Sequence, residues 1–199
     1  MIAKGGRSFV GLGALAAAVS FPFSLAACAA FVALTVFLIL VFRDPERQIG
    51  DGIVSPADGT VREVDAQRGL VSIYLALRNV HVTRSPYDGE VLTADRSAGA
   101  HAPAFSKRTL GNERVEISLK TGIGEVSVIE MTGAIARRIV PYVRQGQHLL
   151  KGERMSLIRF GSRVDLFMPP AKVRIAVVKG QRVRAGVTRL AEVLDGRVD

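Results

Sequence analysis

The residues with the clearest chemical potential are Gly161 and Ser162, inside a strand-like stretch at 159–165. Glycine has no Cβ, so the hydroxyl of Ser162 can come close to the carbonyl carbon before it. That approach allows an N→O acyl shift, which turns the peptide into an ester. Elimination of the ester and hydrolysis of the resulting dehydroalanine leave a pyruvoyl group, whose carbonyl condenses with amines and withdraws electrons. We therefore predict that the chain cuts itself here, although a Gly-Ser pair by itself is far more typical of a turn between strands.

The other residue types that often carry chemistry exclude several classes of site. Cys28 is the only cysteine, so an intramolecular disulfide and a cysteine-based zinc site are excluded. His81, His101 and His148 are scattered, and the sequence has no nucleotide-type glycine loop. We predict no metal site.

The charge balance favours an anionic partner. Lysine and arginine number 27 against 18 aspartate and glutamate residues, a net charge of +9. Such an excess suits either nucleic acid or an anionic membrane surface. Three tyrosines and no tryptophan argue against a platform for stacking bases. Together with the apolar start of the chain, this predicts a membrane partner and no nucleic acid.

The first fifth of the chain predicts a membrane anchor. No charged residue occurs from 8 to 42, which is longer than the roughly 20 residues of one membrane helix. Pro22 should break a helix near the middle, and basic residues flank both ends. We therefore expect residues 1–42 to form a helical hairpin in the cell membrane, spanning or re-entrant, with a catalytic body at 43–199 on the cytoplasmic face. The alternative is a cleaved signal peptide, suggested by small residues at 26–30.

Beyond residue 43 the pattern changes to short alternating runs separated by glycine, proline and aspartate. This predicts a mainly β body, a sandwich or partly closed barrel. One short helical pattern occurs at 135–140. The expected strands are 59–64, 70–75, 89–93, 114–120, 124–131, 157–160, 164–168 and 172–177.

Two internal echoes support a β body. The pattern Ser-Pro-x-Asp-Gly-x-Val occurs at 55–61 and again at 85–91, and its turn residues should start the same kind of hairpin twice. Gly-Gln, four intervening residues and a second Gly occur at 146–152 and 180–186, resembling the half-motifs of lipoyl and biotinyl hammerhead modules. Those modules carry a lysine between the halves. Here the stretch 159–165 lies between them and has no lysine, which counts against a swinging-arm domain.

Six stretches in order resemble the phosphatidylserine decarboxylase family, in its short, archaeal-type form. They cover the chain from about residue 42 to 168. The matching pieces are FRDP at 42–45, SPADG at 55–59, VHVTRSP at 80–86, NER at 112–114, ARRIV at 136–140 and FGSRVD at 160–165.

The resemblance implies a proenzyme that splits between Gly161 and Ser162. The chains 1–161 and 162–199 would remain together as a heterodimer, and exposed strand edges would favour further dimerisation. Ser162 would act first as the nucleophile of cleavage and then, as the pyruvoyl group, as the partner of the substrate amine. The reaction implied is the conversion of phosphatidylserine to phosphatidylethanolamine and CO₂. The alternative is a non-enzymatic, membrane-tethered hammerhead adaptor, whose chain stays intact.

The resemblance also assigns His81 as the acid and base, and the unperturbed pKa of histidine lies near neutrality. Longer bacterial members carry a second histidine three residues on, assigned to self-cleavage, where this chain has Arg84. The division of labour therefore stays open. Asp58 would orient the histidine in a Ser-His-Asp arrangement. Its alternative role is to cap its own turn, as Asp88 would.

Four arginines are possible partners for the lipid phosphodiester, because guanidinium groups match phosphate oxygens. The alternative for each is a solvated charge or a structural ion pair. They are Arg114, Arg137, Arg138 and Arg163.

Overall fold

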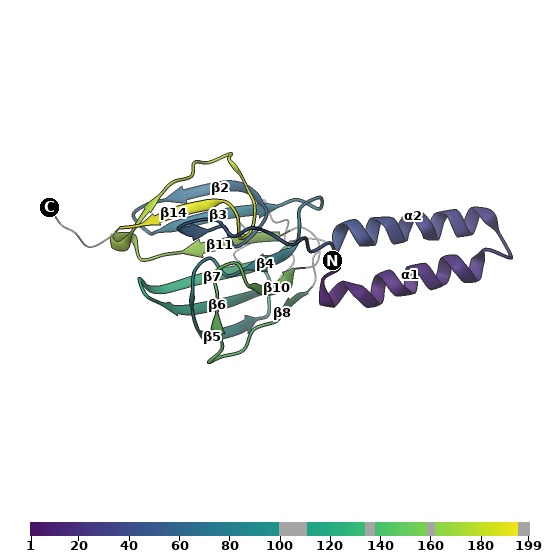
Figure 1. The fold of residues 1–199 in the computed structure, drawn as a ribbon, viewed down its shortest axis with the longest axis horizontal. Coiled ribbons are helices and arrows are strands. Elements are labelled where there is room, and N and C mark those ends of the chain that lie inside the picture. The colour runs from purple at the N-terminus through teal and green to yellow at the C-terminus, as the bar shows by residue number, and fades with distance from the viewer. Residues whose placement is uncertain (100–110, 134–137, 159–161, 195–199) are drawn as a thin grey trace. The chain divides into compact units, whose positions relative to one another are not determined.

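The computed structural model describes residues 1–99, 111–133, 138–158 and 162–194 (Figure 1). The chain divides into two compact units, Met1–Glu46 and Arg47–Asp199.

The first unit is a helical hairpin, as predicted. A short 3-10 turn, Lys4–Gly6, leads into α1, Arg7–Ser20, and α2 follows as Leu25–Val41. Ser24 caps α2 by accepting a hydrogen bond from the N–H of Ala27 at 3.3 Å. Gly13 lets the helices approach closely, because a Cβ there would lie 2.7 Å from Thr35 Oγ1.

The hairpin exposes an unusual amount of apolar side chain. Its helices have 14 and 17 residues, about 21 and 26 Å at 1.5 Å per residue. Within the described ranges, neither helix combines the length and apolar character needed to cross a membrane. The placement of the hairpin in a membrane therefore stays a prediction. The large exposed apolar side chains include Leu12, Leu15, Val19, Phe21, Phe23, Leu25, Phe31, Val32, Leu34, Val36, Phe37, Ile39 and Leu40.

The second unit is built from strands, which confirms the predicted mainly β body. Eight strands form one antiparallel sheet in the order β13-β2-β3-β11-β7-β6-β5-β9, and two three-stranded sheets have the orders β4-β10-β8 and β1-β14-β12. The strands are β1 Ile53–Val54, β2 Gly59–Asp65, β3 Leu70–Leu75, β4 Val82–Arg84, β5 Gly89–Ser97, β6 Arg114–Thr121, β7 Gly124–Thr132, β8 Ile139–Pro141, β9 His148–Leu149, β10 Arg154–Ile158, β11 Ser162–Phe167, β12 Val173–Ile175, β13 Arg182–Val183 and β14 Arg189–Val193.

The helical pattern expected at 135–140 is wrong where the structure describes it. Residues 139–141 form β8, in which Val140 pairs with Leu157 of β10. Two β-branched residues followed by Pro141 favour a strand over a helix, and pairing with a buried neighbour fixes that choice. Residues 135–137 lie outside the described ranges, as do residues 159–160 of the strand expected at 157–160.

The two kinds of repeated sequence motif form backbone hydrogen bonds with each other. Gly180 N–H donates to the carbonyl of Val61, and Gly146 N–H donates to that of Val91, each at 2.8 Å. In the same way β13 pairs with β2, and β9 pairs with β5. Each Ser-Pro-x-Asp-Gly turn thus folds against one Gly-Gln segment, giving two similar halves.

The strand that begins with Ser162 lies between these halves. In the eight-stranded sheet, β11 has β13-β2-β3 on one side and β7-β6-β5-β9 on the other. Figure 1 shows β3 and β7 flanking β11. Val164 and Leu166 of β11 are fully buried in the apolar core. The central position holds the start of β11 between two neighbours.

Candidate active site

Ser162 occupies a buried position at the first residue of β11. Its register partners are Leu75 of β3 and Thr132 of β7, and it is 0% exposed. Among the described residues, its Oγ has no hydrogen-bond partner. A buried hydroxyl without a partner is costly and uncommon. The position therefore suits a group that is consumed or converted, such as the precursor of a pyruvoyl carbonyl. Gly161 lies outside the described ranges.

Strand alternation defines the surroundings of the Ser162 side chain. Residues opposite one another in an antiparallel pair project to the same face, as do residues two apart along a strand. Ser162 therefore shares its face with Thr132, Val164 and Glu130, and Glu130 is the register partner of Val164. All four residues are buried. The reacting group would face the dry core.

His81 is buried immediately before β4, with 1% of its surface exposed. Its carbonyl accepts a hydrogen bond from the N–H of Ile158 at 3.0 Å. Ile158 is the last residue of β10, four positions before Ser162 in the chain. The histidine backbone is therefore hydrogen-bonded to β10, the strand that precedes Ser162 in the chain.

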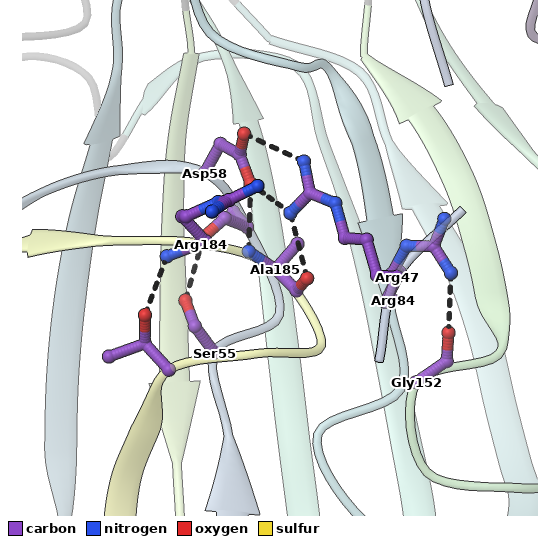
Figure 2. Close-up of polar contacts among 9 residues, drawn as sticks. Arg47, Ser55, Asp58, Arg84, Gly152, Arg184 and Ala185 are labelled. Atoms are coloured by element: carbon purple, nitrogen blue, oxygen red, sulfur yellow. Dashed lines mark hydrogen bonds and ion pairs between the residues drawn. The ribbon is translucent and has the colours of Figure 1, made fainter. Parts of the chain in front are cut away.

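Asp58 has contacts that differ from the expected ones. Its Oδ1 lies 2.5 Å from Arg47 Nη1 and its Oδ2 lies 2.9 Å from Arg47 Nη2, a two-pronged ion pair. Oδ1 also accepts the N–H of Ala185 at 2.8 Å (Figure 2). Within the described part of the chain, the Asp58 carboxylate makes no hydrogen bond to His81. The orienting role of Asp58 therefore stays a prediction, and the partners of its carboxylate, Arg47 and the N–H of Ala185, lie outside its own turn.

Arg84, which stands where longer members carry a histidine, is buried as well. Its Nη1 donates to the carbonyl of Gly152 at 2.9 Å (Figure 2). Its backbone N–H donates to the carbonyl of Pro56 at 2.9 Å. The guanidinium thus contacts the Gly-Gln segment at 146–152, at the glycine that ends it.

The sequence predictions missed a buried carboxyl, Glu130 of β7. Its two oxygens lie 2.6 Å from Thr83 Oγ1 and 2.5 Å from Ser156 Oγ. Burial raises the pKa of Glu130 from its ordinary value of 4.5 to about 7, opposed by the hydrogen bonds from Ser156 and Thr83. The sequence did contain a signal that Glu130 is buried, because Val126, Val128 and Glu130 occupy alternate positions along the expected strand. That alternation places the glutamate on the buried face.

The four arginines have different surroundings. Arg163 Nε contacts Asp165 Oδ1 at 2.7 Å, and its Nη2 lies 3.7 Å from Glu63. Arg163 also alternates with Ser162 and so projects to the other face of the sheet. Arg114 and Arg138 are exposed, while Arg137 lies outside the described ranges.

Comparison with known proteins identifies the family. The family model for phosphatidylserine decarboxylase matches residues 34–191. A phosphatidylserine decarboxylase proenzyme from Streptomyces coelicolor is 46% identical over 162 residues, covering 79% of this chain and 74% of its own length. The "Putative archaetidylserine decarboxylase proenzyme" of Halobacterium salinarum is 45% identical over 188 residues, covering 92% and 91%. A protein of the same name from Methanosarcina acetivorans is 40% identical over 209 residues, covering 99% of both chains.

The chain therefore belongs to the phosphatidylserine decarboxylase family, as its six ordered stretches predicted.

Proposed function

We propose that this protein is a self-cleaving, pyruvoyl-dependent enzyme that decarboxylates phosphatidylserine to phosphatidylethanolamine and CO₂. The family match supports the reaction. The observation that carries the proposal for this chain is the buried Ser162 hydroxyl, which has no partner among the described residues and stands at the head of a central strand.

Cleavage would begin with Ser162 Oγ. Its bond to the carbonyl carbon of Gly161 forms, the peptide C–N bond breaks, and the proton from Oγ ends on the freed nitrogen. A base then takes the Cα proton of residue 162 and the Cβ–Oγ bond of the new ester breaks, leaving a carboxylate on Gly161 and dehydroalanine at position 162. Addition of water and loss of ammonia complete the pyruvoyl group. His81 is the proposed carrier of the proton.

The fold accounts for how the two chains would stay together. The chain 162–199 would contribute β11, which pairs with β3 and β7 over six residues on each side. It would also contribute β14, which lies between β1 and β12. Separation would break both sets of pairings and expose the core, so we propose a stable heterodimer.

In decarboxylation, the pyruvoyl group and the side chains around it would have different tasks. The pyruvoyl carbonyl supplies the electron sink. The residues around position 162 exclude water, and His81 would deliver the proton that replaces CO₂ on the substrate carbon. Arg114 and Arg138, both exposed, are the arginines best placed to bind phosphate. Asp58 stays the proposed orienting group for His81, and its ion pair with Arg47 and its bond from the N–H of Ala185 would hold the carboxylate in place.

We further propose that the helical hairpin holds the enzyme at the cell membrane with its body on the cytoplasmic face. A lipid with two acyl chains rarely leaves the bilayer, since each buried CH₂ is worth roughly 0.8 kcal/mol. The exposed apolar side chains of α1 and α2 suit insertion. Lys4, Arg7 and Arg43 near the ends of the hairpin favour the cytoplasmic side. Because both helices are short, we expect the hairpin to re-enter its own side of the bilayer.

The intact mass of the purified protein tests the proposal. The wild-type protein should give two chains, with residues 162–199 carrying a pyruvoyl N-terminus, and Ser162→Ala should stay in one piece. Borohydride with labelled phosphatidylserine should attach the label to the short chain. An uncleaved wild-type protein in active membranes would decide for the adaptor alternative.

The proposed role of His81 has its own measurement. His81→Ala should lose CO₂ release from phosphatidylserine while its circular dichroism spectrum stays that of a β protein. Unchanged turnover would remove His81 from the mechanism.

A further inference from the structure

Glu130, Thr83 and Ser156 form a closed triangle of short contacts in the core. Thr83 Oγ1 and Ser156 Oγ lie 2.6 and 2.5 Å from the two oxygens of Glu130, and they lie 2.8 Å from each other. All three residues are 0% exposed. Glu130 forms no ion pair with any described residue, so nothing on those residues balances a negative charge there.

The number of hydrogen atoms available for these three contacts indicates whether Glu130 is charged. Each of its three oxygen–oxygen contacts needs one hydrogen, and the two hydroxyls supply only two. With an ionised carboxylate, both hydroxyls would donate to it, and the Thr83–Ser156 contact would set two lone pairs against each other. A proton on Glu130 removes this conflict. The carboxyl then donates to Thr83, Thr83 donates to Ser156, and Ser156 donates back to the other carboxyl oxygen.

The triangle also joins three strands that neighbour the proposed reacting groups in the sequence or in the sheet. Thr83 is two residues after His81, and Ser156 lies on β10, the strand that leads to the cleavage position. Glu130 lies on β7, two residues before Thr132, the register partner of Ser162. Diagonal neighbours of this kind are roughly 7–8 Å apart. Glu130 is thus close to Ser162 without being placed to touch it.

We propose that Glu130 is a positioning residue: as a neutral carboxylic acid it closes a ring with Thr83 and Ser156 that holds the His81 segment and β10 against the strand beside Ser162. This inference rests on the proposed self-cleavage and adds the device that aligns its parts. The pKa of Glu130, raised to about 7 by burial, agrees with the hydrogen count.

Rates of chain cleavage, measured on the full-length protein made in a cell-free system, test the ring. Glu130→Gln keeps one donor and one acceptor where the neutral acid has them, so its rate should stay within about threefold of wild type. Glu130→Leu keeps the bulk and removes the ring. It should cleave on the order of 100-fold more slowly, the usual loss for a displacement of about 1 Å. Thr83→Val and Ser156→Ala should each slow cleavage by about tenfold. Glu125→Gln, the same change at an exposed position of β7, should leave the rate unchanged.

The outcomes separate the ring from the proposed function. A Glu130→Gln protein as slow as Glu130→Leu would overturn the neutral ring, because it would show that the carboxylate charge is required. If Glu130→Leu fails to fold, the Thr83 and Ser156 variants decide, and wild-type rates in both would also overturn it. If the wild-type protein itself does not cleave, the proposed function fails. If it cleaves and the ring variants match it, only this inference fails.

Discussion

The two halves of the β body repeat the same turn with different surroundings. In the first half Asp58 Oδ1 accepts the N–H of Ala185 at 2.8 Å, and in the second Asp88 Oδ1 accepts the N–H of Lys151 at 2.9 Å. Both turns start with a serine whose hydroxyl donates to the carbonyl two residues on, Ser55 at 2.6 Å and Ser85 at 2.7 Å. The backbone arrangement is therefore shared.

The halves differ in the charged side chains that surround the shared turn. Asp58 is 8% exposed and is paired with Arg47, whose side chain is 3% exposed. Asp88 is exposed, and among the described residues its carboxylate accepts a hydrogen bond from the backbone N–H of Lys151 and has no ion pair. The second half instead carries His81 and Arg84 just before its turn. The turn residues therefore give both halves the same backbone arrangement, and the charged side chains beside each turn make the halves different.

The largest expected effect comes from breaking the ion pair between Arg47 and Asp58. Asp58→Asn keeps an acceptor for the Ala185 N–H but leaves the Arg47 guanidinium buried without a counter-charge. We expect a loss of about 3–5 kcal/mol in the free energy of unfolding. Urea titration followed by circular dichroism measures it, in full-length protein carrying Ser162→Ala so that the chain stays intact.

Asp88→Asn is the matched control for that change. Because Asp88 is exposed and has no ion pair with any residue in the described ranges, the loss of unfolding free energy should stay within roughly 0.5 kcal/mol. Adding Arg47→Met to Asp58→Asn should recover part of the stability, since a neutral pair leaves no buried charge. Equal losses in the two aspartate variants would mean that the ion pair does not distinguish the halves.

A second prediction contrasts the paired carboxylate of Asp58 with Glu130, which has hydroxyl partners only. Folding raises the pKa of Glu130 from 4.5 to about 7, so the folded protein binds this proton more tightly than the unfolded chain. The contribution of Glu130 to stability is therefore full below pH 4.5, declines as the pH rises to about 7, and is level above. The decline should reach roughly 3 kcal/mol.

Glu130→Gln isolates this contribution. The difference in unfolding free energy between the variant and its parent, followed from pH 4.5 to 7.5, should shift by that amount in favour of the variant. A constant difference would show that Glu130 titrates normally. The same urea titrations in the Ser162→Ala background provide the measurement.

The smallest expected effect tests what the halves share. Gly146 and Gly180 have φ of +78° and +91°, and a Cβ at either would meet nothing within 4 Å. Alanine there should cost about 1 kcal/mol, from backbone strain alone. The two losses should agree within roughly 0.5 kcal/mol, the usual scatter between independent sites. Gly122→Ala, at an open position without positive φ, is the control. Unequal losses at 146 and 180 would contradict the equivalence of the halves.

Many of the strands and turns could be predicted from local sequence patterns. Alternation located most of the strands, and proline with glycine and aspartate located the paired turns, because these preferences depend on neighbouring residues. The helix expected at 135–140 is wrong at 139–140, where β-branched side chains and pairing with β10 favour a strand. The family could be predicted from six ordered stretches, since their order survives without any knowledge of contacts.

By itself, the sequence determined the duplicated turns, the Gly161–Ser162 bond between the two Gly-Gln segments and the apolar hairpin. Only the tertiary structure decided which charges meet. Arg47 and Asp58 come together with Ala185, 127 residues beyond Asp58, and Glu130 joins hydroxyls from two other strands. Periodicity and turn chemistry are properties of a few adjacent residues, whereas the charge that a buried carboxyl carries depends on whichever groups the completed fold brings beside it.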